Sequence, residues 1–138
     1  MTEIDLKNYL AQYRENKEGT RIYIDALMRY RETLESFSVD VTKEYIKDID
    51  RRINQLEDEI KQKDAIVFEW SKLIRNDTAR ELFVKHYING VDWLTIEDIY
   101  HYATSTVYGY NKRALTEITQ KAVQDIAPAS VQTATSIL

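Results

Sequence analysis

Apolar side chains recur every three or four positions through most of the first half of the chain, which is the spacing of one face of an α-helix. The pattern predicts helices over residues 2–17, 20–37 and 43–75. Gly19 is expected to end the first of them, and the β-branched and turn-forming residues of 38–42 to separate the other two. The first half is therefore expected to be entirely helical.

The longest predicted helix, 43–75, carries a seven-residue repeat. Its apolar positions are Ile46, Ile49, Ile53, Leu56, Ile60, Val67, Trp70 and Ile74, and Lys63 alone interrupts them. The helix at 20–37 has a matching repeat in Tyr23, Leu27, Tyr30, Leu34 and Phe37. Such repeats form a hairpin within one chain or a coiled coil with a second copy. Both alternatives are open, and we expect a homodimer or higher homo-oligomer through 43–75.

The second half has shorter apolar patterns, which predict helices over 79–88, 93–101 and 104–123. Thr78 followed by Glu81 has the spacing of a capping box at the start of the first. The other two present small apolar faces: Trp93, Ile96 and Ile99 on the shorter helix, and Val107, Ala114, Leu115 and Ile118 on the longer one.

A short helix, a tight turn and a longer helix make up a helix-turn-helix, the unit that places its second helix in the major groove of DNA. The turn at 101–104 must reverse the chain within about three residues, which usually needs a positive φ. Because this turn has no glycine, His101 or Tyr102 must adopt that conformation.

These patterns predict an all-α fold, with an N-terminal helical hairpin or coiled-coil stalk followed by a C-terminal helix-turn-helix. We expect three segments: an oligomerisation segment at 1–75, the helix-turn-helix at 76–123, and a flexible tail at 124–138, which has small residues, one proline and little charge.

Composition narrows the function. The 138 residues carry a net charge of −4 and include no cysteine, and no apolar run approaches the length of a membrane span. The N-terminus lacks the apolar core of a signal peptide, so we expect a cytoplasmic protein. Basic and acidic residues balance over 78–123, so an expectation of DNA binding depends on local geometry and not on bulk charge.

Motifs for catalysis are weak. Ser105, His101 and Asp98 could be written as a triad, but no glycine-flanked nucleophile surrounds Ser105. His86 and His101 are the two histidines, and they have no metal-ligand spacing. No glycine-rich loop for phosphate is present. We expect no enzyme activity, no cofactor and no metal.

The stretch HYINGVDWLTIEDIYHYATSTVYGYNKRALTEI, residues 86–118, resembles the C-terminal helix-turn-helix of small phage and prophage transcriptional regulators of the ArpU and RinA kind, which in turn resemble region 4 of sigma factors. The shared elements are Tyr-Ile-x-Gly at 87–90, Trp93, Ile96, His-Tyr at 101–102, Val-Tyr at 107–108 and Arg-Ala-Leu at 113–115. The resemblance implies a role in switching on late phage genes in a bacterial host, with helix 104–123 in the major groove.

The candidate DNA-binding residues follow from this placement, because the N-terminal exposed side chains of a recognition helix meet the bases. They are Thr104, Ser105, Thr106, Tyr108, Gly109, Lys112 and Arg113, with Lys85 and His86 on the preceding helix beside the DNA backbone. Each also has an ordinary structural interpretation: Thr104 and Ser105 as caps, Lys112 and Arg113 as solvated charges. Asn111 is expected to be a hydrogen-bonded core residue, and Trp93 to belong to the core.

Double-stranded DNA is thus the expected partner, and two other functions remain open. A small terminase-like subunit for packaging phage DNA would use the same two parts, with multivalency offsetting weak single-site binding. An adaptor would use the helix-turn-helix to contact RNA polymerase or another protein, and the balanced charge of 78–123 favours that alternative.

Overall fold

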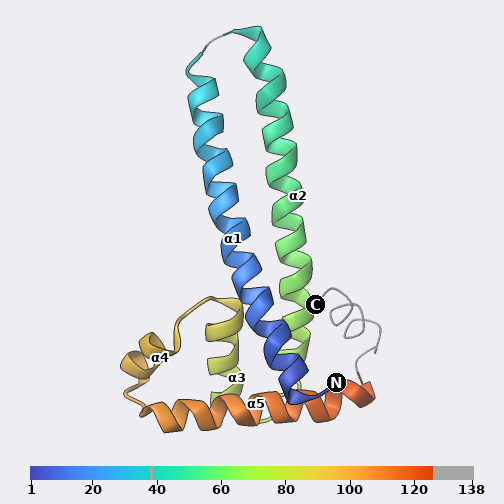
Figure 1. Cartoon of the computed structure of the whole chain (residues 1–138), viewed down its shortest axis with the longest axis vertical. Helices are drawn as coiled ribbons and strands as arrows, with labels where there is room; N and C mark the ends of the chain where they lie inside the picture. Colours follow the sequence, from blue (N-terminus) through green and yellow to red (C-terminus); the bar gives the residue numbers. More distant parts are fainter. Residues whose placement is uncertain (38, 126–138) are drawn as a thin grey trace. The chain divides into compact units, whose positions relative to one another are not determined.

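The computed structural model describes residues 1–37 and 39–125, with side chains described as far as Lys121, and the regular elements in these ranges are helices. This confirms the predicted all-α class (Figure 1). The chain forms two compact units, one from residues 1–14 together with 64 onwards, the other from 15–63. The sequence had placed a boundary at 75, but the first turns of the chain and the end of the second long helix pack with the helix-turn-helix.

Helix α1 spans Glu3–Glu35, so the two helices predicted over 2–17 and 20–37 are one. The prediction that Gly19 ends a helix was wrong. Glycine inside a helix costs only about 1 kcal/mol relative to alanine. Buried residues on both sides, Tyr13 and Ile24, keep the helix in contact with its neighbours in the two units. Packing therefore outweighs the weak local preference of a single exposed glycine.

The unit of residues 15–63 is a helical hairpin, in which α1 pairs with α2 (Asp40–Ser71) through an apolar seam (Figure 1). The buried residues of the seam are Ile24, Leu34, Ile49, Ile53, Leu56 and Ile60. Of the two arrangements that the repeat allowed, the chain shows the internal hairpin. The connection is also shorter than the predicted 38–42, since α1 ends at Glu35 and α2 begins at Asp40; Ser38 lies outside the described residues.

The repeat predicted for 20–37 is only half correct. Leu34 is buried and Leu27 packs against the same seam, but Tyr23, Tyr30 and Phe37 are 48%, 54% and 56% exposed. The face that meets α2 is centred between Ile24 and Leu27, because Ile24 takes the place expected for Tyr23. The three aromatic side chains consequently lie beside the seam and not in it.

The other unit has a core built from segments far apart in the sequence. It combines the start of α1, the end of α2, helix α3 (Asp77–Phe83), the π-helical turn η1 (Val84–Ile88) and helix α5 (Thr104–Asp125). Its largest buried side chain is Trp70, whose ring packs edge-on against that of Tyr9 with 5.3 Å between the ring centroids. Val67, Trp70 and Ile74, expected to continue the stalk, instead belong to this core.

Helix α2 ends at Ser71, four residues before the predicted end, and α3 begins after Asn76. The predicted capping box of Thr78 and Glu81 is not the cap. Asn76 has extended backbone angles and its Oδ1 accepts a hydrogen bond from the Ala79 N–H at 2.9 Å. Asparagine caps helices as well as threonine does, so the cap falls two residues earlier. Glu81 instead accepts a hydrogen bond from the Tyr100 hydroxyl at 2.7 Å.

Candidate nucleic-acid interface

Helices α4 (Trp93–Tyr100) and α5 are joined by the tight turn that the sequence predicted. His101 has φ 57° and ψ 39°, the left-handed conformation, so of the two expected residues it is His101 that reverses the chain. Its backbone N–H and that of Tyr102 both donate to the Glu97 carbonyl, which closes the end of α4. Histidine tolerates this conformation better than a β-branched residue would.

A small core holds the helix-turn-helix together. It consists of Leu82, Ile96 and Val107, one buried residue from each of α3, α4 and α5. Aromatic rings surround it: Tyr102 lies 5.5 Å from Tyr100 and 5.8 Å from Tyr110, measured between ring centroids. The expected inward faces of α5 are confirmed, since Val107, Ala114, Leu115 and Ile118 are all buried.

Ile99 was expected to share the buried face of α4, and this was wrong, because its side chain is 56% exposed. Helix α4 has eight residues, so it offers only two turns to the core. Ile96 and Tyr100, four residues apart, occupy them. Ile99 lies to one side of that line and faces outwards.

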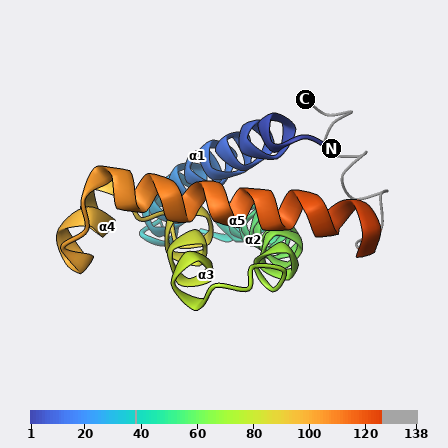
Figure 2. The ribbon, with the colours of Figure 1, turned by 90° about the horizontal axis from the view of Figure 1, so that it is seen from below.

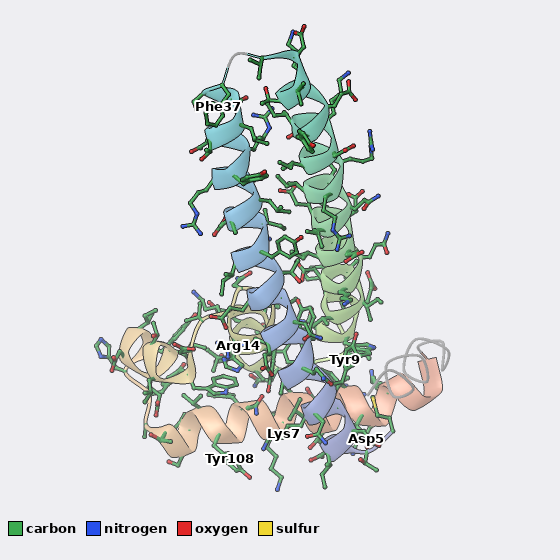
Figure 3. The ribbon with its side chains drawn as sticks, turned by 45° about the horizontal axis from the view of Figure 1, so that its top comes forward. Asp5, Lys7, Tyr9, Arg14, Phe37 and Tyr108 are labelled. Atoms are coloured by element: carbon green, nitrogen blue, oxygen red, sulfur yellow. The ribbon has the colours of Figure 1, made fainter. Side chains whose placement is uncertain are left out.

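The first half of α5 presents an open face. Thr104, Ser105, Thr106, Tyr108, Gly109, Lys112 and Arg113 are all exposed. Ser105, Gly109 and Lys112 follow the helical repeat along one line, opposite the buried line of Val107 and Ala114. Tyr108, 63% exposed, projects beside it (Figure 3). The structure therefore brings together seven of the nine candidates on one helix.

Lys85 and His86, the candidates on the preceding helix, are placed differently. Lys85 is half-buried on η1, with its Nζ 5.5 Å from the centre of the Tyr100 ring. His86 is only 6% exposed, so the expectation that it contacts the DNA backbone was wrong. Its ring stacks on Trp93 at 3.7 Å, and its Nδ1 lies 2.7 Å from the Val91 carbonyl oxygen. His86 thus supports the loop before α4 from inside.

Arg14 of α1 holds the outer side of the same loop (Figure 3). Its guanidinium donates to the carbonyl oxygens of His86 and Gly90, both at 3.1 Å, and to the Asp92 carboxylate at 2.9 Å. The loop that aims α4 is therefore fixed by a residue that lies far away in the sequence.

Burial lowers the pKa of His86 to about 4, although the contact with the Val91 carbonyl acts in the opposite direction. In the unfolded chain the pKa returns to about 6.5. Between these values the unfolded chain binds a proton that the folded chain excludes. The free energy of unfolding should then decrease by about 3 kcal/mol as the pH falls from about 6.5 to about 4.

Chemical denaturation at a series of pH values measures this effect. His86→Gln, which keeps a hydrogen-bond donor but cannot be protonated, should remove most of the slope in that range. His101→Asn is the matched control, since asparagine also tolerates the left-handed conformation, and it should keep the slope. An unchanged slope in His86→Gln would show that another group is responsible.

One further basic residue joins this surface from α1. Glu3 accepts a hydrogen bond from the Thr116 hydroxyl, and the start of α1 lies next to α5 in both views (Figures 2 and 3). Lys7 is exposed and lies one turn beyond Glu3 on α1. A separation of more than 100 residues left no sequence signal for the contact between Glu3 and Thr116.

A small pocket of about 150 Å³ opens between α4 and α5. It is lined mainly by apolar surface and adjoins the open face of α5; its residues are Trp93, Glu97, Thr104, Val107, Tyr108 and Asn111. Asn111 Oδ1 accepts a hydrogen bond from the Tyr87 hydroxyl at 3.0 Å, so the expected hydrogen bond is present although the side chain is only half-buried. A methyl group or a short aliphatic side chain fits such a volume.

The described residues also bear on metal binding and membrane insertion. Across residues 1–37 and 39–125, no three acidic, histidine or cysteine side chains lie close enough together to bind a metal ion. No helix in the same part of the chain is both long and apolar enough to cross a membrane. No protein-family model matches the chain, and neither a curated protein nor a solved structure shows significant similarity to it.

Proposed function

We propose that this protein binds double-stranded DNA and places the first half of α5 in the major groove, as a transcriptional regulator of the phage type. One observation supports the proposal most strongly. In this helix-turn-helix, with its left-handed turn at His101, seven residues between Thr104 and Arg113 of α5 are exposed, while the second half of the helix packs against α1 and α3. An open first half is what groove reading requires of a recognition helix.

The exposed side chains supply two kinds of contact. Ser105 and Thr106 hydroxyls donate to or accept from base edges, and the Tyr108 ring or a threonine methyl contacts thymine methyl groups. Lys112, Arg113 and Lys7 contact phosphates, which positions the protein without selecting a sequence. The open pocket beside Thr104 and Tyr108 provides an apolar recess for a thymine methyl.

The proposed location and target promoters follow from the resemblance to ArpU- and RinA-like regulators. The site would act in a bacterial cytoplasm on late phage promoters. A contact with RNA polymerase in place of DNA is the second candidate, because the helix-turn-helix region balances its basic and acidic residues. DNA binding and its dependence on salt separate the two.

Gly109 offers a test by gain of function. It lies on the open line between Ser105 and Lys112, and an added Cβ there would meet nothing within 4 Å. Gly109→Lys should therefore fold normally and add one phosphate contact. Its affinity for DNA should rise roughly tenfold near 0.1 M salt, and the salt dependence should steepen by about one unit in log–log slope.

The measurement is fluorescence anisotropy with labelled duplexes enriched from a random-sequence pool. Gly19→Lys is the matched control, because Gly19 is also an exposed glycine inside a helix with open space around it, but lies in the hairpin unit. It should leave the affinity unchanged. Equal effects of the two variants would indicate only nonspecific attraction, and no binding of any duplex at low salt would refute the proposal.

A further inference from the structure

The hairpin unit carries an exposed apolar surface that the helix-turn-helix does not use. On α1, Tyr23 and Tyr30 are seven residues apart, so they lie along one side of the helix, and exposed Phe37 follows in the turn just past its end (Figure 3 labels Phe37). On the first turns of α2, Val41 is 68% exposed and Tyr45 57%. We call these five residues the aromatic flank.

The helical repeat places Tyr23, Tyr30, Val41 and Tyr45 on the same side of the hairpin. Tyr23 directly precedes the seam residue Ile24 on α1, and Tyr45 directly precedes Ile46 on α2. In an antiparallel pair of helices, the residues that directly precede a seam residue in the sequence lie on one flank, whichever helix they belong to. The residues that directly follow a seam residue lie on the other flank. Asp50 directly follows the seam residue Ile49, so it lies on the opposite, polar flank, where it forms an ion pair with Arg31 (Arg31 Nε lies 2.5 Å from Asp50 Oδ1).

The size of the aromatic flank indicates what covers it. A large aromatic side chain has about 150–250 Å² of surface. Four such rings about half exposed, together with Val41, amount to roughly 500 Å² of apolar surface per chain. This is in the upper half of the range of about 300–600 Å² for the largest apolar patch of a monomer, and it could supply over half of the roughly 800 Å² that each partner buries in a standard interface.

We propose that the aromatic flank is the surface through which two copies of this chain associate. The residues expected to mediate oligomerisation, the seam of 43–75, are already buried within one chain, so a second copy must use another face. A flank built along two helices is suited to a two-fold arrangement, in which the same residues meet from both copies. On this side of α2, Arg52 and Glu59 carry opposite charges, so a second copy meets no uniform repulsion.

The test is the mass of the full chain in solution, measured without DNA by sedimentation equilibrium between about 1 and 100 µM. The wild-type chain should be a dimer at the upper concentrations. A Tyr30→Lys, Tyr45→Lys double variant places two charges in the interface, and its dimer dissociation constant should rise by about a hundredfold or more. The helical circular dichroism signal should be retained, because both side chains are exposed in the monomer.

Met28→Lys is the matched control. Met28 is also an exposed apolar residue of α1, at 41%, but it directly follows the seam residue Leu27 and so lies on the polar flank. This variant should dimerise like the wild type. A wild-type chain that stays monomeric throughout would overturn the proposal, as would a dimer that the double variant leaves intact or that Met28→Lys weakens equally. The readout is independent of DNA, so a failure here leaves the proposed function untouched.

Discussion

Ile96→Asp is expected to unfold the helix-turn-helix, whereas Ile99→Asp, three residues along the same helix, is expected to be tolerated. Ile96 is completely buried between Leu82 and Val107, while Ile99 is 56% exposed. Removing a buried isoleucine costs about 2–5 kcal/mol, and burying an unpaired carboxylate adds several more. The total, about 5 kcal/mol or more, is comparable to the whole stability of many domains.

Denaturant unfolding and near-ultraviolet circular dichroism measure the difference between these variants. Ile99→Asp should lie within about 0.5 kcal/mol of the wild type, as most surface substitutions do. The two changes have the same chemistry on the same short helix, so helix propensity cancels between them. If both were tolerated, or both were severe, the orientation of α4 described above would be incorrect.

Reversing two charges on α5 should have the largest effect on DNA binding. Lys112→Glu together with Arg113→Glu removes the two phosphate contacts that we propose for these residues and adds repulsion. Both side chains are exposed, and the distance of 3.8 Å between Arg113 Nε and Glu117 Oε1 marks only a weak ion pair. Affinity should fall by at least about 100-fold near 0.1 M salt, and the log–log salt dependence should weaken by about two units.

The matched control reverses two exposed charges on α2 of the hairpin unit, through Lys47→Glu and Arg51→Glu. It changes the net charge of the chain by the same amount. If DNA binding depended on total charge alone, the two double variants would weaken it equally. A site on α5 instead predicts that the control keeps most of the wild-type affinity.

Much of the helix-turn-helix could be predicted because its signals are local. The spacing of Val107, Ala114 and Ile118 identifies the buried side of α5, and therefore the exposed side, without knowledge of the partners. The turn could be predicted in the same way, since a reversal within three residues needs a positive φ and His101 was one of two residues able to supply it. Local geometry is sufficient wherever contacts are close in sequence.

The parts that could not be predicted depend on contacts between distant segments. Nothing near Arg14 indicates that it binds the loop at 86–92, and nothing near Glu3 indicates that it accepts a hydrogen bond from Thr116 of α5. Gly19 was misread for the same reason, because long-range packing on both sides decides whether the helix continues. His86 is a polar residue for which the sequence suggests a place on the surface, and only its stacking on Trp93 shows that it is buried.

Photo-crosslinking from single positions tests the central claim most directly. A photoreactive amino acid would be introduced in turn at Gly109, on the open face of α5, at Ile99, on the outer side of α4, and at Met28 in the hairpin. Each protein would be irradiated with a labelled duplex enriched from a random pool. The proposed function predicts strong crosslinking to DNA from position 109, with little or none from 99 and 28. Efficient crosslinking from 99 or 28 with none from 109 would contradict the assignment of α5 as the DNA-reading helix.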